Sequence, residues 1–336
     1  MTTTAYTAAR ERAAWIDRSS RGRIVVSGVD RRSYLQGLLT NDVAALMPGT
    51  GCYAAYLTAQ GRMIADLWVY ELGEVILLAM NGELKDTLLA RFDQFIFGED
   101  VQLGDVTAAF AEIAIVGPQA AELVSRVLMG VSSETLTALP EHGNLRATFD
   151  GAPAIVTRTS DVGEPGFDLY VSADRRAELV RAVASAGAPE IDVETAETIR
   201  VEAGVPLFHR DMDEETIPLE AGIESRAISF TKGCYVGQEV IIRVMHRGHG
   251  RVARRLVSLA VDGDTVPERG SAIEAGAKTV GEVTSAVFSP KRGGPIALGY
   301  VQRDVAEPET MVRINSSSAG GNGRAAISAR VTQRIS

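Results

Sequence analysis

An eight-residue stretch of this chain gathers side chains that could do chemistry. It reads Lys232-Gly233-Cys234-Tyr235-Val236-Gly237-Gln238-Glu239, and so combines a cation, a thiol, a phenol, an amide and a carboxylate with two glycines. Glycines permit backbone angles, or a close approach of a ligand, that a side chain would prevent. We therefore expect this 232–239 motif to present its thiol at a bend of the chain.

Cys234 is the candidate nucleophile of this motif. A lone cysteine is most often an inert core residue, and we expect this of Cys52. The apolar run at 240–245, however, predicts a helix whose N-terminal dipole would lie near Cys234, and Lys232 would add positive charge. Both effects lower the pKa of a thiol and favour the thiolate. Such a thiolate could attack, take up a one-carbon or sulfur group, or ligate iron transiently.

Length, charge and cysteine content limit the class of protein. The 336 residues exceed a typical domain of about 100–200 residues, so we expect two or three structural units. There is no apolar run of about 18 residues and no secretory signal, which predicts a cytoplasmic protein without a membrane partner. The two cysteines show no CxxC spacing, so neither a disulfide framework nor a cysteine-based metal site is expected. The net charge of −9 argues against a nucleic-acid partner.

Periodicity predicts the elements that must position these side chains. Asp30 is a candidate cap of a helix that ends near Leu39, and strands at 52–58 and 63–70 form a predicted hairpin. Beyond residue 250, short apolar runs at 256–260, 297–301, 311–314 and 325–331 alternate with turn clusters, which predicts a small β-barrel or sandwich. Further predicted strands lie at 75–80, 111–116, 155–157 and 167–171, and further helices at 83–95, 175–186 and 195–204.

We place a domain boundary near Gly250, which separates residues 1–250 from a C-terminal region at 251–336. The serine- and glycine-rich residues 316–323 are expected to form a long hairpin loop within the second region.

Several separated stretches match one family. The 232–239 motif agrees with the family signature KGCYxGQE at every fixed position, and the segments at 200–206, 211–213 and 217–223 follow the family in order and spacing. The chain resembles the YgfZ family of folate-dependent iron-sulfur cluster assembly proteins, which are relatives of the aminomethyltransferase (T-protein) of the glycine cleavage system. The resemblance implies an α+β fold of two intertwined lobes plus a C-terminal β-barrel, arranged as a three-lobed ring around a central folate site.

The resemblance also implies residues that would hold tetrahydrofolate. Glu202, with Arg200 two residues earlier, would bind the pterin, because a carboxylate accepts two parallel N–H hydrogen bonds; alternatively, Glu202 is a surface residue in a helical ion pair. Asp66 matches the second member of an Asp-Asp pair, one member of which positions or deprotonates the amine at folate N5 in the T-protein relatives, and Ala65 replaces the first. If the replaced member does the chemistry, this chain would bind folate without cleaving aminomethyl groups. Asn81 matches a folate contact, or simply ends a strand.

A cluster of basic residues lies between positions 243 and 255 of this acidic chain, and two interpretations of it are possible. It is either a solvated face or an anion site for a folate tail or for an acidic partner surface. Its members are Arg243, His246, Arg247, His249, Arg251, Arg254 and Arg255.

The sequence therefore predicts a tetrahydrofolate-binding protein that supports assembly or repair of iron-sulfur clusters in client or assembly proteins, its transient partners. Cys234, Lys232 and Asp66 are the candidate catalytic residues, and Glu202, Asn81, Asp66 and Arg200 the candidate folate ligands; Gly233, Tyr235, Gly237, Gln238 and Glu239 complete the motif. No resident metal is expected. Two alternatives stay open, a folate-dependent aminomethyl or methyl transferase and a non-catalytic scaffold.

Overall fold

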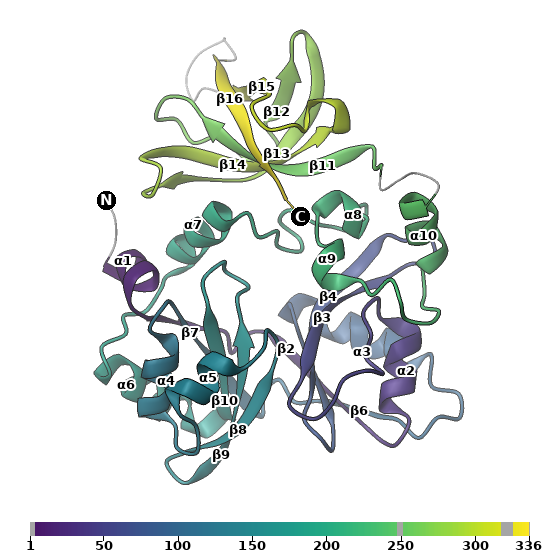
Figure 1. The fold of residues 1–336 in the computed structure, drawn as a ribbon, viewed down its shortest axis with the longest axis vertical. Helices are drawn as coiled ribbons and strands as arrows, with labels where there is room; N and C mark the ends of the chain where they lie inside the picture. Colours follow the sequence, from purple (N-terminus) through teal and green to yellow (C-terminus); the bar gives the residue numbers. More distant parts are fainter. Residues whose placement is uncertain (1–3, 247–250, 317–324, 336) are drawn as a thin grey trace.

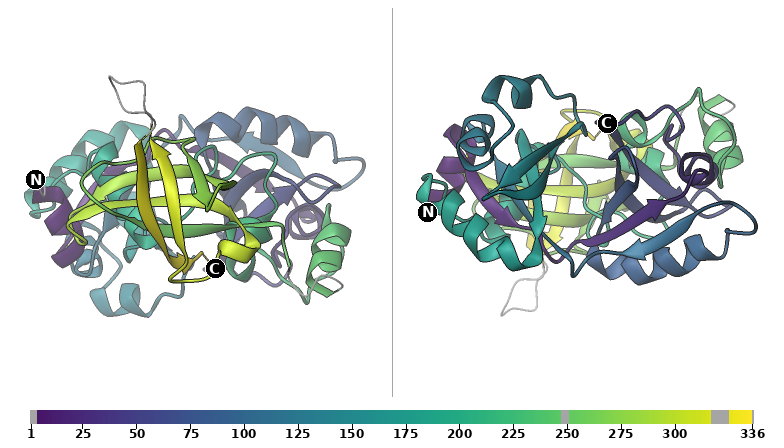
Figure 2. Two further views of the ribbon diagram at one scale, coloured as in Figure 1. Left: turned by 90° about the horizontal axis from the view of Figure 1, so that it is seen from above. Right: turned by 90° about the horizontal axis from the view of Figure 1, so that it is seen from below.

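The structure is a computed structural model that describes residues 4–246, 251–316 and 325–335. Two lobes of mixed helix and sheet lie side by side, and a β-barrel lies across both (Figure 1). Seen along the perpendicular direction, the barrel covers the region where the two lobes meet (Figure 2). The predicted fold, two intertwined α+β lobes with a C-terminal β-barrel, is confirmed.

The first lobe is built on an antiparallel sheet with the strand order β3-β4-β5-β2-β6. Its strands are β2 (Gly22–Ser27), β3 (Gly51–Leu57), β4 (Met63–Glu71), β5 (Ile76–Met80) and β6 (Gln102–Asp105). Its helices are α2 (Arg31–Leu38), η1 (Gly82–Leu84), α3 (Lys85–Asp93), α8 (Pro218–Ala221), α9 (Glu224–Ala227) and α10 (Gln238–His246). Helix α2 follows the predicted period, because Tyr34, Leu35 and Leu38 are its buried residues.

The second lobe has an antiparallel sheet with the order β1-β7-β10-β9-β8. Its strands are β1 (Ala14–Asp17), β7 (Phe110–Val116), β8 (Asn144–Phe149), β9 (Ala152–Thr159) and β10 (Gly166–Ser172). Its helices are α1 (Thr4–Glu11), α4 (Ala120–Val127), α5 (Ser133–Ala138), η2 (Ala173–Arg175), α6 (Arg176–Ser185) and α7 (Val193–Ala203). Helix α7 is capped at both ends. The Asp192 side chain accepts a hydrogen bond from the Thr195 amide at 2.7 Å, and Gly204 is the C-cap with a left-handed φ of 68°.

The two lobes are intertwined because the chain alternates between them. Helix α1 and strand β1 belong to the second lobe, β2 to β6 to the first, β7 to α7 to the second again, and α8 to α10 to the first. As a result the N-terminal helix packs beside α7, where Tyr6 and Ala9 share a buried cluster with Ile199. Residues nearly two hundred positions apart therefore form one interface.

The closed barrel has the strand order β11-β14-β13-β12-β15-β16. It packs on α7, because Val201 is buried in one cluster with Leu256 and Leu298. Helix α7 thus connects the second lobe to the barrel. The barrel elements are β11 (Arg254–Val261), β12 (Ala272–Ala275), β13 (Lys278–Ser289), β14 (Gly294–Gln302), η3 (Arg303–Val305), β15 (Met311–Ser316) and β16 (Ala325–Arg334).

Most predicted elements are present, and several elements of the structure were not predicted. The 52–70 hairpin is β3 and β4, the helix after Asp30 is α2, and the apolar run at 240–245 lies in α10. The α-helices and strands that were not predicted are α1, α5, α8, α9, β1, β6, β8, β12 and β13. Of these, β13 is the longest barrel strand, and apolar and polar residues are mixed in it.

Two predictions concern residues that the structure does not describe. The boundary at Gly250 lies outside the described residues, and so do residues 317–323 of the predicted loop, although the flanking Ser316 and Ala325 pair across β15 and β16. Within the described ranges, no helix is long and apolar enough to cross a membrane.

Candidate functional site

A cavity of about 270 Å³ lies between the two lobes, close to the start of the segment that follows α7. The first lobe contributes Tyr53, Asp66 and Trp68 from its hairpin. The opposite wall comes from the second lobe and from the segment after α7, through Glu141, His142, Ser160, Asp161, Arg200, Val205, Pro206 and Leu207. Arg21 and Arg226 complete the lining. Polar groups from distant parts of the sequence therefore converge on one small space.

Asp66 faces this cavity because of the alternation along β4. Ala65 and Leu67 are fully buried in the core of the first lobe, so the intervening Asp66 and the next residue on its face, Trp68, are directed to the other side of the sheet. An aspartate at position 65 would point into that core and not into the cavity. The replacement of the first Asp of the relatives' pair by Ala65 therefore leaves the cavity carboxylate in place.

The Asp66 carboxylate is held in a desolvated environment. Burial raises its pKa, and the hydrogen bond from the Tyr53 hydroxyl at 2.6 Å together with the charges of Arg21 and Arg226 opposes this rise. The Tyr53 and Trp68 rings lie next to each other, with centroids 5.7 Å apart. This wall of the cavity thus combines an aromatic surface with a carboxylate.

Guanidinium groups lie over both aromatic rings. Arg21 is 4.5 Å from the centre of the Trp68 ring, and Arg226 is 5.4 Å from that of Tyr53. Arg21 also donates to Asp161 and, at 3.2 Å, to Glu112. Arg226 is exposed, and its guanidinium forms no ion pair with any residue that the structure describes. A positive charge is therefore available at the edge of the cavity.

A buried network of charges fixes the wall behind Arg21. Burial raises the pKa of Glu112 to about 7, whereas at Asp161 the charges of Arg18 and Arg21 outweigh burial and hold the pKa well below its usual range. The network joins the segment before β2 to β7 and β10, and therefore ties the two lobes together. Its members are Arg18, Arg21, Arg23, Glu112, Asp161 and Asp168.

Arg200 and Glu202 lie on different sides of α7. Arg200 lines the cavity, is buried, and donates to Asp211 at 2.6 Å and to Ser285 at 2.9 Å. Glu202 instead accepts hydrogen bonds from Tyr6 at 2.8 Å, from Arg10 and from Ser289. Although burial raises the pKa of Glu202, these donors lower it below its ordinary value. The structure thus brings Arg200 to Asp66 but places the Glu202 carboxylate between α1 and the barrel.

Asn81 also lies outside the cavity lining among the described residues. It precedes η1, and its side-chain oxygen accepts a hydrogen bond from the Glu83 amide at 3.1 Å. Asn81 therefore caps η1 directly after β5, which agrees with the alternative that it simply ends a strand.

Lys232 anchors the 232–239 motif to α2. Its ammonium donates to the carbonyls of Gln36, Leu39 and Asn41 at 2.6–2.8 Å, at the C-terminal end of that helix. Burial lowers its pKa to about 8. The sequence suggested this charge as a partner of Cys234, but the ammonium is directed at the three carbonyls, and Asp42 and Cys52 are the ionisable groups whose charges act on it.

Two further residues of the motif fix it to the first lobe. Tyr235 is buried in the core of that lobe, and Gly237 has a φ of 85° with its Cα so close to the β3–β4 turn that a Cβ would lie 2.5 Å from the Thr58 carbonyl. Cys234 lies between Lys232 and Tyr235 and is exposed. Helix α10 begins at Gln238, whose amide side chain donates to the Gly233 carbonyl at 3.4 Å, and Glu239 is exposed. The motif is therefore anchored on both sides of an exposed thiol.

His142 is a cavity residue that the sequence reading missed. Its Nδ1 is buried without a hydrogen-bond partner among the described residues, and burial lowers the pKa of the ring. A neutral imidazole therefore has one nitrogen free to meet a ligand. Tyr53 and Trp68 were missed too, although their spacing from Asp66 in a hairpin could have revealed them. Among the described residues, no group of three or more His, Cys, Asp and Glu side chains is arranged to hold a metal ion.

The fold and the cavity define a T-protein-like protein, and the comparison with known families agrees. Residues 2–232 match the GCVT N-terminal domain, and residues 254–333 match the glycine cleavage T-protein C-terminal barrel domain. The chain belongs to the glycine cleavage T-protein family.

Particular members of this family are similar over most of the chain. The aminomethyltransferase of Rubrobacter xylanophilus is 34% identical over 88% of this chain and 78% of its own length. That of Streptomyces coelicolor is 31% identical over 91% of this chain and 82% of its own length. The crystal structure of glycine cleavage system aminomethyltransferase T from Bartonella henselae superposes with a TM-score of 0.84 at 21% identity, covering 98% of this chain and 87% of that one, and so supports the fold.

Proposed function

We propose that this chain binds tetrahydrofolate in the central cavity and transfers an aminomethyl group to it. The relatives named above are aminomethyltransferases, which favours the transferase alternative over iron-sulfur cluster assembly as the main activity. The observation that carries the proposal is the Asp66 carboxylate, which faces the cavity beside two aromatic rings and accepts a hydrogen bond from Tyr53.

The cavity suits the pterin end of a folate. Its wall of Tyr53 and Trp68 offers an aromatic face to a flat ring, and Asp66 can accept N–H hydrogen bonds from that ring. The free Nδ1 of His142 supplies a further polar contact. At about 270 Å³ the cavity falls just below the roughly 300–1,000 Å³ of sites for whole drug-sized ligands, so the rest of the folate would extend outward past Arg226.

The position of Asp66 in the cavity supports a chemical role for its carboxylate. In the proposed transfer, folate N5 forms a bond to the methylene carbon of the donor's aminomethyl group, and the bond from that carbon to the donor breaks with its electron pair remaining on the donor atom, which takes up the proton lost by N5. Folate N10 then bonds to the same carbon, and the amino group leaves as ammonia with the N10 proton, which gives methylenetetrahydrofolate. Positive charge develops on N5, and a nearby carboxylate in a desolvated site stabilises it or accepts its proton. Tyr53 would keep Asp66 oriented toward the cavity.

Titration of tetrahydrofolate into the purified protein tests this proposal. We expect saturable binding by the wild type and affinity at least about tenfold lower for Asp66→Asn, because a carboxylate that accepts two N–H hydrogen bonds is replaced by an amide. The exposed Asp262→Asn is the matched control and should bind like the wild type. Formation of methylenetetrahydrofolate from an aminomethyl donor would then test turnover. Equal affinity of Asp66→Asn and the wild type would refute the assignment, and an absence of saturable binding would favour a scaffold.

The exposed thiol of Cys234 favours a second candidate function. The 232–239 motif resembles that of the YgfZ branch, and its anchors leave the thiol accessible to a client protein. In this second reading the folate-bound protein supports assembly or repair of iron-sulfur clusters through Cys234. Complementation of a strain that lacks its own YgfZ relative, with Cys52→Ala as the control, tests it. If Cys234→Ala restores the activity of iron-sulfur enzymes fully, the thiol has no such role.

A further inference from the structure

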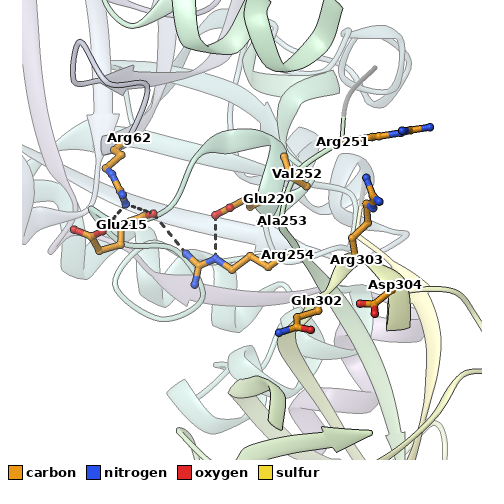
Figure 3. A pocket seen from close by; sticks show the side chains of 10 residues that line it. All are labelled: Arg62, Glu215, Glu220, Arg251, Val252, Ala253, Arg254, Gln302, Arg303 and Asp304. Atoms are coloured by element: carbon orange, nitrogen blue, oxygen red, sulfur yellow. Dashed lines mark hydrogen bonds and ion pairs between the residues drawn. The ribbon is translucent and has the colours of Figure 1, made fainter. Parts of the chain in front are cut away.

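A second and larger hollow, of about 990 Å³, lies where the first lobe meets the barrel (Figure 3). Four arginines line it: Arg62 follows the β3–β4 turn, Arg251 and Arg254 lead into the barrel, and Arg303 begins η3. None of its lining residues belongs to the central cavity. It is therefore a separate site that the proposed folate binding does not use.

Two of these arginines are neutralised by the chain itself. Arg62 is paired with Glu215, and Arg254 donates to Glu220 at 3.0 Å (Figure 3). Arg254 also lies 4.5 Å from the centre of the Tyr300 ring. The Arg254–Glu220 pair joins β11 of the barrel to α8 of the first lobe, whereas Arg62 and Glu215 both lie outside the barrel.

The other two arginines are not neutralised in this way. The side chains of Arg251 and Arg303 form no hydrogen bond or ion pair with any residue in the described ranges, and both are exposed in the hollow (Figure 3). The Arg303 amide donates to the Ala253 carbonyl at 3.1 Å, so the backbone of Arg303 is held against the chain two residues after Arg251. Asp304 also lines the hollow but forms no ion pair with either guanidinium among these residues. Within the part of the chain that the structure describes, the hollow thus contains two guanidinium groups without an ion pair and one such carboxylate, Asp304, in a protein of net charge −9.

We propose that this hollow binds a small polyanion, with Arg251 and Arg303 bridged by its oxygens. A guanidinium presents N–H donors in a planar fork that fits a carboxylate or phosphate, and an anion between two such groups relieves their repulsion. The ligand class is an oxyanion with two or more charges, supplied either as phosphates or as carboxylates. The barrel and the first lobe would both contact it, because the paired Arg62 and Arg254 form the adjacent wall.

Part of the basic cluster seen in the sequence belongs to this hollow. Arg251 and Arg254 line it, whereas Arg62 and Arg303 come from distant parts of the chain. Arg247 and His249 lie outside the described residues. The proposed anion site therefore uses one member of the sequence cluster, Arg251, together with Arg303, which no local sequence pattern indicates.

Calorimetric titration with two probes, tripolyphosphate and citrate, tests this proposal at low and at physiological salt. We expect saturable binding of at least one probe, and about tenfold weaker binding of that probe to Arg251→Gln and to Arg303→Gln, with a larger loss in the double variant. The probe that binds more tightly identifies the anion chemistry.

The matched control is Arg330→Gln, which removes a similarly exposed barrel arginine that is paired with Glu309. It should bind like the wild type. Failure of both probes to saturate would overturn the proposal. An equal loss of affinity in Arg330→Gln would overturn it as well, because binding would then follow net charge and not the hollow. Tetrahydrofolate titration of the double variant should match the wild type, so the two sites are tested separately.

Discussion

The Tyr53 hydroxyl donates a hydrogen bond to Asp66 across the β3–β4 hairpin, at 2.6 Å. Burial raises the pKa of Tyr53 well above its ordinary value, so the phenol stays protonated and remains a donor. The same burial raises the pKa of Asp66, and the bond from Tyr53 opposes that rise. Tyr53 therefore contributes, together with Arg21 and Arg226, to keeping the Asp66 carboxylate ionised in the cavity.

Tyr53→Phe should move the pH dependence of folate binding upward. The pKa of Asp66 is already raised by burial, and loss of the hydroxyl removes a group that lowers it. The carboxylate would then be lost at a higher pH as the solution is acidified, so tetrahydrofolate affinity should begin to fall at a higher pH. Affinity measured from pH 5 to pH 8 checks this, with Tyr300→Phe in the barrel as the control. Coincident pH profiles for Tyr53→Phe and the wild type would contradict the role of Tyr53.

The two glycines of the 232–239 motif should respond differently to alanine. Gly237 has a φ of 85°, and its Cβ would lie 2.5 Å from the Thr58 carbonyl, whereas a Cβ at Gly233 meets nothing within 4 Å. Gly237→Ala should lower the free energy of unfolding by more than about 2 kcal/mol, and Gly233→Ala by less than about 1 kcal/mol. Urea unfolding at constant pH measures both. Similar losses for the two variants would show that the close contact at Gly237 is not a constraint.

The sequence predicted the local elements of this protein better than its long-range contacts. Periodicity located α2 and the β3–β4 hairpin because each is a local pattern of apolar residues. It missed α1, whose importance lies in partners nearly two hundred residues away. The arrangement of the three lobes came from the resemblance and not from periodicity, because no local pattern encodes which lobe a strand joins.

The candidate site was predicted only in part, because its side chains meet through long-range contacts that local sequence patterns do not encode. Asp66 and Arg200 do line one cavity. The motif match indicated Glu202 as a pterin ligand, yet its carboxylate accepts hydrogen bonds from Tyr6 of α1 and Ser289 of β13, which are both distant from it in the sequence. Likewise, the sequence suggested that the Lys232 charge acts on the Cys234 thiol, whereas in the structure the ammonium donates to carbonyls at the end of α2. A residue type indicates what a side chain can do, and the tertiary fold decides which of its partners is present.

Glu202→Gln tests whether this residue is structural or a folate ligand. Its side chain is almost fully buried and joins Arg10 and Tyr6 of α1 to Ser289 of the barrel. Loss of the charge should cost about 2 kcal/mol of unfolding free energy, because it breaks a partly buried ion pair and leaves Arg10 with Glu164 alone. Glu164→Gln removes the other partner of Arg10 and should cost less, about 1 kcal/mol, since Glu202 remains.

Tetrahydrofolate titration of the same variant separates the two roles. We expect Glu202→Gln to bind within about threefold of the wild type at a temperature where both are folded. A loss of tenfold or more without loss of stability would mean that the carboxylate reaches the pterin after all.

Because of Lys232, the free energy of unfolding should increase with pH above about pH 8. Its pKa in the folded state is about 8, below the ordinary 10.5. Between these values the unfolded chain holds a proton at this lysine that the folded protein has released, so this group raises the free energy of unfolding as pH increases, by up to about 1.4 kcal/mol per pH unit.

Comparison of Lys232→Met with the wild type at pH 7, 8, 9 and 10 measures this contribution. At pH 7 the variant should be less stable by about 2 kcal/mol, because the carbonyls of Gln36, Leu39 and Asn41 lose their donor at the end of α2. Above pH 8 the difference should widen in favour of the wild type. Lys278→Met, at an exposed lysine that contacts Gln302, should show neither effect. A difference between Lys232→Met and the wild type that stays constant from pH 7 to pH 10 would mean that the ammonium keeps its proton against the three carbonyls, whose hydrogen bonds then outweigh its burial.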